Sequence, residues 1–511
     1  MMRKIIYMFL MSVLLCTTSC LDKFPENAVP ENRAITNVDE ADQAVIGIYS
    51  SFLSSALYSG YLTLLPDVQC DLVYAVNGYS NNLGDIWRWN ILATNGQIEA
   101  VYGSLYSLIG RCNFLLDNAA KLMPTLVNDD DVDHLEKLCG EAYFARALAY
   151  SELIKLFCED YKGDDDAKTK LGVVLTTSYY NKEAIVRASL YDSYQLVLSD
   201  LDKAAKYLAL DEDYDPAYDG YLYNYSTFFN EYTVYALRAR VALYMRAYDE
   251  AVKYSSKIID SNMYTLSSVN YQYSSGVSYY DLMWQNDLST EVIWKVGFTA
   301  ANYGGAIGSV FFNYDYSSYK PDYVPAQWVL DLYAATDGRY NAFFRTATTG
   351  YSHGLTWPLV YKYWGNQDLY AEARLLNVSM PKVFRLSEQY LIRAEAYCNL
   401  ETPDYGKAGR DISTLRSARY TSGSSAAITA DNAMDVIEEE RVKELFMEGF
   451  RLQDLKRWGK GFERKPQDQS LPHGSSLKVS AENPLFVWPI PQHELESPDG
   501  INIKPNASNK Y

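Results

Sequence analysis

The sequence IEEERVKELFMEGFRLQDLKRWG, which runs from Ile437 to Gly459, is the most informative stretch of this chain. Three of its acids, Glu440, Glu444 and Glu448, recur every four residues, and such a row would repel itself on an isolated helix. A cation three residues away from an acid would reduce this repulsion. The spacing therefore predicts one helix with a partly buried ladder of i, i+3 ion pairs, which are Arg441 with Glu444, Glu448 with Arg451, and Asp454 with Arg457.

Amphipathic helical patterns precede this segment along the chain. Thr36 precedes Glu40 at the spacing of a helix cap, and the apolar residues that follow fall on one helical face. The stretch 140–161 carries alanines on one stripe, which lets two helices approach closely. Two further stretches, 235–259 and 391–419, have the pattern helix, tight turn, helix and resemble the tetratricopeptide unit. We therefore expect a mainly α fold with a tetratricopeptide-like α–α superhelical scaffold.

The composition changes between about Ser261 and Met380. Alanine-rich helices give way to Tyr, Ser, Gly and Asn, with a strand predicted at 291–298 and a helical patch at 326–333. We expect this region to be an inserted, loop-rich α+β subdomain that binds the ligand, because loops on a rigid frame are where recognition usually takes place.

The N-terminus has the pattern of a bacterial lipoprotein signal. Two basic residues precede an apolar run from Ile5 to Cys16, and small residues lead into Cys20. The run is shorter than the roughly 20 residues that cross a bilayer. We expect residues 1–19 to be a signal peptide, Cys20 to carry lipid, and residues 20–35 to form a tether. The alternative is plain secretion, with cleavage close to the same position.

Composition excludes several classes of function. The formal net charge of −18 repels phosphate backbones, so we expect no nucleic-acid partner. The five cysteines beyond the signal region show no CxxC spacing, and the four histidines are far apart. We therefore predict no disulfide framework, no metal centre and no cofactor. The excess of 47 tyrosines over 18 phenylalanines and 9 tryptophans indicates many ring contacts, in the core or with a ligand.

Paired carboxylates raise the alternative of a glycosidase, whose two acids stand about 5 to 10 Å apart across a sugar. In the segment 437–459, however, each acid has an arginine within reach. A neighbouring guanidinium lowers the pKa of a carboxyl group and makes it a poor proton donor. We therefore expect these acids to be structural, and the protein not to be an enzyme.

The segment 437–459 resembles the signature near the C-terminus of the SusD/RagB family of outer-membrane nutrient-binding lipoproteins. Further stretches resemble the same family, namely 140–150, 187–208, 236–240, 385–419 and 488–491. The resemblance covers essentially the whole mature chain. It implies tetratricopeptide-like helical pairs that form a scaffold, and a variable region that supplies the ligand site.

The resemblance also implies a role as a surface-exposed lipoprotein of the outer membrane. Such proteins act as a lid on a SusC-like TonB-dependent transporter, capture oligosaccharides or, in some relatives, peptides, and perform no chemistry. The organisation that we expect is a signal peptide (1–19), a lipidated tether (20–35), a helical scaffold (36–260) with a ligand loop at about 71–90, a variable subdomain (261–380), and C-terminal helices with the family signature (381–511).

A sugar presents an apolar face of C–H groups ringed by hydroxyls, so its receptor needs exposed rings flanked by amides and carboxylates. Two segments, 71–90 and 302–323, have this composition. Trp87 and Trp89 alternate, which would place both rings on one side of an extended chain. The candidate glycan-binding residues are Tyr74, Tyr79, Asn81, Asp85, Trp87, Trp89, Tyr303, Tyr314, Tyr316 and Trp357.

Three alternatives to oligosaccharide capture differ in the site that they predict. Peptide capture by the same lid mechanism would favour a deep acidic pocket without stacked rings. A tetratricopeptide-type protein–protein adaptor would show a bare concave groove and no aromatic cluster in its loops. A hydrolase would hold two unpaired carboxylates that face one another in a cleft.

Overall fold

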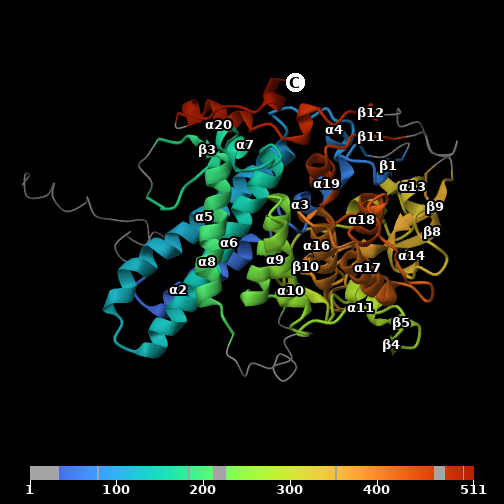
Figure 1. Ribbon diagram of the computed structural model, residues 1–511, viewed down its shortest axis with the longest axis horizontal. Coiled ribbons are helices and arrows are strands. Elements are labelled where there is room, and N and C mark those ends of the chain that lie inside the picture. Colours follow the sequence, from blue (N-terminus) through green and yellow to red (C-terminus); the bar gives the residue numbers. More distant parts are fainter. Residues whose placement is uncertain are drawn as a thin grey trace, which may run out of the picture.

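The computed structural model describes residues 34–76, 80–180, 184–210, 226–351, 354–464, 478–498 and 500–510. The signal peptide, Cys20 and the tether up to residue 33 lie outside these ranges. Within them the protein is mainly helical, with six two-stranded antiparallel sheets (Figure 1). None of the described helices is long and apolar enough to cross a lipid bilayer. The predicted fold class, a mainly α scaffold with a loop-rich α+β insertion, is confirmed.

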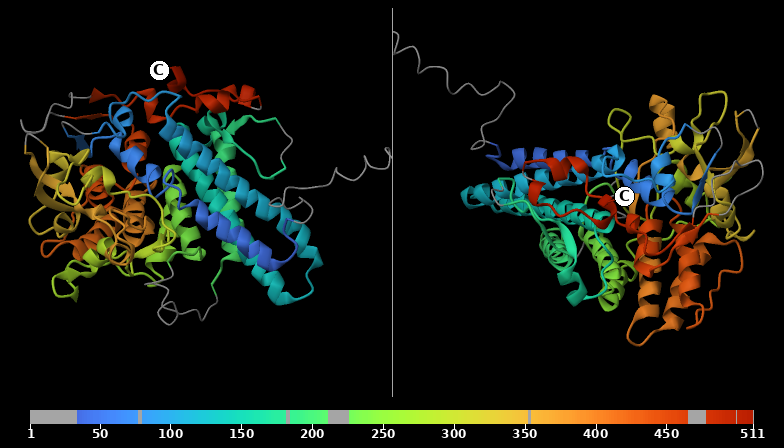
Figure 2. Two further views of the ribbon diagram at one scale, coloured as in Figure 1. Left: turned by 180° about the vertical axis from the view of Figure 1, so that it is seen from behind. Right: turned by 90° about the horizontal axis from the view of Figure 1, so that it is seen from above.

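The scaffold is a series of helices that pack on one another in chain order. They are α2 (Val38–Ser51), α5 (Gly96–Leu122), α6 (Asp129–Phe157), α8 (Leu190–Tyr207), α9 (Glu231–Tyr244), α10 (Tyr248–Ile259), α16 (Leu386–Asn399) and α17 (Tyr405–Arg419). Helix α6 packs on α5 and α8, while α10 packs on α9 and α16, and α16 packs on α17. Figure 2 shows α2 lying along α5 and α6 in one half of the molecule, with the orange helices in the other half.

Shorter elements complete the fold. The helices are α3 (Tyr61–Val68), α4 (Gly84–Trp87), α7 (Asp164–Thr169), α11 (Tyr279–Gln285), α12 (Ser309–Phe312), α13 (Gln327–Leu330), α14 (Arg339–Phe343), α15 (Gln367–Ala373), α18 (Ala433–Glu444), α19 (Arg451–Trp458) and α20 (Gln492–Glu496). The strand pairs are β1 (Val73–Ala75) with β7 (Tyr323–Pro325), β2 (Leu171–Val174) with β3 (Arg187–Ser189), β4 (Gln272–Ser274) with β5 (Val277–Ser278), β6 (Val292–Lys295) with β10 (Lys382–Arg385), β8 (Phe344–Thr348) with β9 (Thr356–Val360), and β11 (Phe462–Glu463) with β12 (Lys478–Val479).

The predicted helix pairs form where small residues allow close contact. Three alanines of α6, Ala142, Ala145 and Ala149, are fully buried. A Cβ atom at Gly140 would lie 2.8 Å from Cβ of Tyr207 on α8, so a larger residue would push these helices apart. Short turns also separate α9 from α10 and α16 from α17, as the stretches 235–259 and 391–419 predicted.

Two of the strand pairs connect distant parts of the chain. The β1–β7 pair joins the early segment around Tyr74 to the variable region, and the β6–β10 pair joins the variable region to α16. One large hydrophobic core runs from Ile35 to Ile503 and includes residues of all these parts. The loop-rich region is therefore packed against the scaffold and shares its hydrophobic core.

The segment 437–459 forms two helices, which differs from the single helix predicted. Helix α18 ends at Glu444 and α19 begins at Arg451. Between them Met447 and Gly449 have φ angles of 57° and 85°. A Cβ atom on Gly449 would lie 2.6 Å from the backbone oxygen of Leu62, so this turn requires glycine.

This break explains why two of the three predicted ion pairs are wrong. Asp454 does pair with Arg457, at 2.9 Å. Arg441, however, pairs with Asp454 at 2.7 Å and not with Glu444, and Arg451 pairs with Asp71 at 2.8 Å and not with Glu448. The two remaining acids find their partners on other elements: Glu444 contacts Arg339, Arg385 and Arg419, and Glu448 contacts Lys362 and Arg385.

Candidate functional site

A surface loop after α12 is closed by its own polar groups. Oδ1 of Asp315 accepts hydrogen bonds from the backbone N–H groups of Ser317, at 3.0 Å, and Ser318, at 2.8 Å. The hydroxyl of Ser317 donates to the same oxygen, and together these donors lower the pKa of Asp315 to about 2. The loop is thereby held in a shape that presents three tyrosines, Tyr314, Tyr316 and Tyr319.

These tyrosines join two rings from the short helix η4 (Tyr361–Tyr363) and the residue after it. Tyr314 stacks on Tyr319 with centroids 4.8 Å apart, and Tyr361 stacks on Trp364 at 5.6 Å with planes 14° apart. Trp364 connects the two pairs, since it lies 6.1 Å from both Tyr314 and Tyr319. Tyr316 lies 5.8 Å from Tyr314 and is 63% exposed. We call these five residues the aromatic platform.

Charged groups lie at the edge of the aromatic platform. The guanidinium carbon of Arg345, an exposed residue of β8, is 3.5 Å from the ring centroid of Tyr361. Asp315 lies in the platform loop, with Nζ of Lys320 3.9 Å from its Oδ2. Strands β8 and β9 mark this part of the molecule in Figure 1. Partly exposed rings beside charged hydrogen-bonding groups can hold a flat ligand with polar edges.

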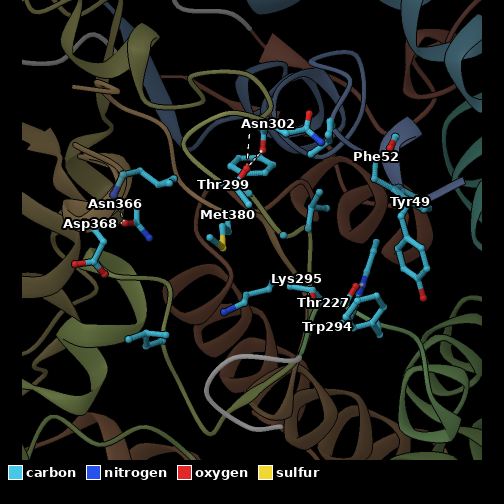
Figure 3. A pocket seen from close by; sticks show the side chains of 18 of the residues that line it. Tyr49, Phe52, Thr227, Trp294, Lys295, Thr299, Asn302, Asn366, Asp368 and Met380 are labelled. Carbon is cyan, nitrogen blue, oxygen red and sulfur yellow. Dashed lines mark hydrogen bonds between the residues drawn. The ribbon is translucent and has the colours of Figure 1, made fainter. Parts of the chain in front are cut away.

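A pocket of ≈ 560 Å³ lies between α2, β6, the loop 297–302 and the start of α15. Figure 3 shows Tyr49 of α2, Phe52 directly after this helix and Trp294 of β6 on one side of it, and Asn366 and Asp368 on the other. The rings of Phe52 and Trp294 meet edge to face at 5.1 Å. We call this the inner pocket. It shares no lining residue with the aromatic platform.

The structure buries four of the predicted ligand-binding rings. Trp87, Trp89, Trp357 and Tyr74 are each less than one-tenth exposed. The three indole N–H groups donate to backbone carbonyl oxygens, those of Val73, Gln69 and Pro325. The extended segment expected around Trp87 and Trp89 is wrong, because residues 84–87 are helical and Trp89 has a φ angle of 58°. All four rings pack in the core, so a stacking role would need a local rearrangement.

Other predicted residues are accessible. Tyr314 and Tyr316 are brought together on the aromatic platform. Tyr303 is 44% exposed and follows Asn302, a lining residue of the inner pocket. Asn81 and Asp85 are exposed as well, and Tyr79 lies outside the described residues.

The two predicted ligand segments do lie side by side. The β1–β7 pair aligns Tyr74 with Val324, and the hydroxyl of Tyr323 donates to the backbone oxygen of Asn82 at 2.7 Å. Ser80 also donates its backbone N–H to Oδ1 of Asp322 at 2.9 Å. Parts of the segments 71–90 and 302–323 therefore contact one another in the fold.

Sequence analysis missed Tyr361, Trp364 and Arg345. A signal was present in the run Tyr361-Lys362-Tyr363-Trp364-Gly365-Asn366, which concentrates rings before a glycine in the variable region. It also missed the inner pocket, because Tyr49 and Phe52 lie on and directly after a helix whose pattern indicates only an ordinary packed face.

Glu440 and Glu444 of α18 are unsuited to proton transfer. Burial alone would raise the pKa of Glu440, but Arg339, Lys443 and Arg416 lower it to about 2. Arginines likewise hold the pKa of buried Glu444 well below its ordinary value, despite the opposing effect of burial. In the described ranges, no cluster of three or more His, Cys, Asp or Glu side chains could hold a metal ion.

Two family models match the chain. The model described as "SusD family" matches residues 356–506, and the model described as "Starch-binding associating with outer membrane" matches residues 21–243. SusD-like protein P2 from Formosa agariphila is 27% identical over 201 residues, which are 38% of this chain and 36% of that protein. The match thus spans about a third of the length of this relative.

Solved structures share the fold over nearly their full length. A SusD superfamily protein from Bacteroides thetaiotaomicron has a TM-score of 0.76 at 23% identity, covering 92% of this chain and 99% of that chain. A putative sugar binding protein from Bacteroides vulgatus has a TM-score of 0.74 at 23% identity, covering 93% and 99%. A SusD-like carbohydrate binding protein from the same species has a TM-score of 0.70 at 18% identity, covering 92% and 98%.

The fold is therefore that of the SusD superfamily, a helical scaffold onto which a loop-rich region is packed. The two family matches together cover well over half of the sequence. The chain is thus similar to the SusD family in sequence over these two ranges, as well as in fold.

Proposed function

We propose that this protein is a non-catalytic surface lipoprotein of the outer membrane, anchored through Cys20, that captures oligosaccharides and delivers them to a SusC-like TonB-dependent transporter. The observation that carries the proposal is the aromatic platform, in which two stacked pairs of rings are connected through Trp364. The transporter and the lipid anchor rest on the family resemblance and on the lipoprotein signal at residues 1–20.

The aromatic platform suits an extended glycan for a physical reason. The C–H face of a sugar packs on a ring, while its hydroxyls need partners at the ring edge. The platform combines the rings of Tyr314, Tyr316 and Trp364 with the exposed guanidinium of Arg345. Several partly exposed rings in a row can hold successive sugars, each with a modest contribution to the binding free energy.

The names of similar proteins support the same ligand class. Two of the solved structures are described as sugar-binding or carbohydrate-binding proteins, and one matching family model is described as starch-binding. The aromatic platform also lies within 261–380, the region that the family resemblance makes responsible for the ligand.

Peptide capture by the same lid mechanism is the alternative. It would favour an acidic pocket without stacked rings, whereas the aromatic platform has stacked rings and Arg345 at its edge. A protein–protein adaptor would not need such a cluster in its loops. A hydrolase would need unpaired acids, and Glu440 and Glu444 of α18 are buried in ion pairs with arginines.

A glycan array with the chain lacking residues 1–20 tests the proposal, with a peptide library on the same surface. Trp364→Ala removes the ring that connects both stacked pairs. Tyr179→Ala is the matched control, because it removes a tyrosine that is 52% exposed and belongs to no part of the platform. We expect a glycan signal from the unaltered chain and from Tyr179→Ala, and a signal weakened about tenfold or more in Trp364→Ala. Peptide binding without any glycan signal would overturn the proposal.

A further inference from the structure

The inner pocket contains a buried ammonium group. Lys295 lies on β6 and is 4% exposed, and Figure 3 shows its side chain reaching across the pocket toward the side of Met380 and Asp368. Its Nζ donates a hydrogen bond to the backbone oxygen of Asp287 at 2.7 Å. Among the described residues, no carboxylate oxygen lies within 4.0 Å of this nitrogen. The ammonium group of Lys295 thus donates to a backbone oxygen and not to a carboxylate.

The nearest acid is already occupied. The carboxylate of Asp287 is fully buried and forms an ion pair with Lys382. Its other oxygen accepts hydrogen bonds from the side-chain amide of Asn366 at 2.7 Å and from the N–H of Met380 at 3.0 Å. Two lysines and one acid leave this buried group with a net charge of +1. An excess of positive charge in a buried environment favours the binding of an anion.

The pKa of Lys295 reflects the same excess of positive charge. Burial lowers it to about 8, the charge of Asp287 opposes this change, and the charge of Lys382 adds to it. Lys295 is therefore still mostly protonated at neutral pH. Asp368 is the further charged residue that lines the pocket, and it is exposed at the rim, where its carboxylate accepts a hydrogen bond from Asn286 at 3.0 Å.

The remaining walls are apolar and rich in rings. Tyr49, Phe52, Phe298 and Met380 line the interior, and Phe228 and Ile46 are more than half exposed at the pocket. A volume of ≈ 560 Å³ lies within the range of about 300–1,000 Å³ that is typical of small-molecule sites. Exposed apolar side chains around such a cavity mark it as a contact surface.

We infer that the inner pocket is a second binding site, which takes a compact aromatic carboxylate whose ring lies between the aromatic walls and whose carboxylate contacts Lys295. Such a ligand supplies the missing negative charge and fills the apolar volume. The site is independent of oligosaccharide capture on the aromatic platform, with which it shares no lining residue.

Calorimetric titration of the chain lacking residues 1–20 with trans-cinnamate and with neutral cinnamamide tests this inference at pH 7. Cinnamate should bind about tenfold more tightly than cinnamamide. Lys295→Met should abolish that preference, and Asp368→Asn should strengthen cinnamate binding, because it removes the rim charge and keeps a hydrogen-bond acceptor for Asn286. Cinnamate binding should weaken as the pH rises above about 8, where Lys295 loses its proton.

Two exposed positions on α2 provide a matched pair of variants. Ser50 lines the inner pocket, whereas Gln43, also exposed on α2, does not. Ser50→Phe should abolish cinnamate binding and Gln43→Phe should leave it unchanged. If Lys295→Met does not fold, the comparison of Ser50→Phe with Gln43→Phe tests the inference by itself.

Equal binding of the two probes, or cinnamate binding that survives Ser50→Phe, would overturn the inference. Trp364→Ala should leave cinnamate binding unchanged, so failure of this inference and failure of oligosaccharide capture are distinguishable.

Discussion

Arg385 on β10 and Glu444 at the end of α18 form a buried ion pair, with Nη1 and Oε1 2.8 Å apart. The same carboxylate lies 2.9 Å from Arg419 of α17 and 3.1 Å from Arg339 of α14. Glu444 therefore connects four elements. Helix α14 belongs to the loop-rich region, and strand β10 lies at the junction of that region with the scaffold. Each of these side chains is almost fully buried, so water does not compensate for a lost partner.

Glu444→Gln should lower the free energy of unfolding by about 3–5 kcal/mol, because it leaves three buried guanidinium groups without their shared charge. Urea denaturation monitored by circular dichroism measures this change. The control is Glu439→Gln on the same helix, whose side chain is 42% exposed and pairs with Lys443. The control substitution should lower the free energy of unfolding by less than about 1 kcal/mol. Similar losses in both variants would contradict the role of Glu444.

Glu440 should make stability depend on acid pH. Its pKa is about 2 in the folded protein and 4.5 ordinarily, so its ionised form favours the folded state. This contribution, about 3 kcal/mol, is complete above about pH 4.5 and is lost as the pH falls through about 2. Unfolding of the unaltered chain and of Glu440→Gln should therefore differ more at pH 6 than at pH 2.5. A difference that stays constant over this range would refute the prediction.

Tyr316→Ala should weaken the binding of the captured oligosaccharide by about 2- to 10-fold, which is what one ring contact contributes. Because this side chain is 63% exposed, the melting temperature should hardly change. Calorimetry and thermal unfolding measure the two effects, with Tyr179→Ala as the control. Unchanged affinity would show that Tyr316 does not contact the ligand.

Trp87→Ala should act on stability and not on ligand binding. The ring is 4% exposed and lies edge-on to Tyr74 at 5.6 Å, so its removal leaves a cavity that costs about 3–5 kcal/mol. Affinity for the oligosaccharide, measured where the variant is still folded, should match that of the unaltered chain. A lower affinity at unchanged stability would show instead that Trp87 reaches the ligand.

Two of the five residues of the aromatic platform could be predicted from local sequence. Tyr314 and Tyr316 lie in a segment rich in rings and glycine, and the loop that holds them is closed by bonds between near neighbours. Trp364 was missed because it lies far along the chain, and its place in the cluster depends on a contact with α12, where its ring lies 5.0 Å from that of Phe312. The spacing of residues along the chain does not indicate such a contact.

The sequence by itself determined the mainly helical fold class, the pairing of helices into tetratricopeptide-like units and the resemblance to a family, because caps, small-residue stripes and signature motifs act between residues that are close in the chain. The tertiary structure alone decided which arginines meet Glu444, that Trp87 and Trp357 are buried, and that Lys295 lies in a pocket with its ammonium group bonded to a backbone oxygen. The physical reason is that burial and charge pairing depend on segments that approach one another only after the chain has folded. The turn at Gly449 shows the difference, since it redirected acids that a single helix would have paired with its own arginines.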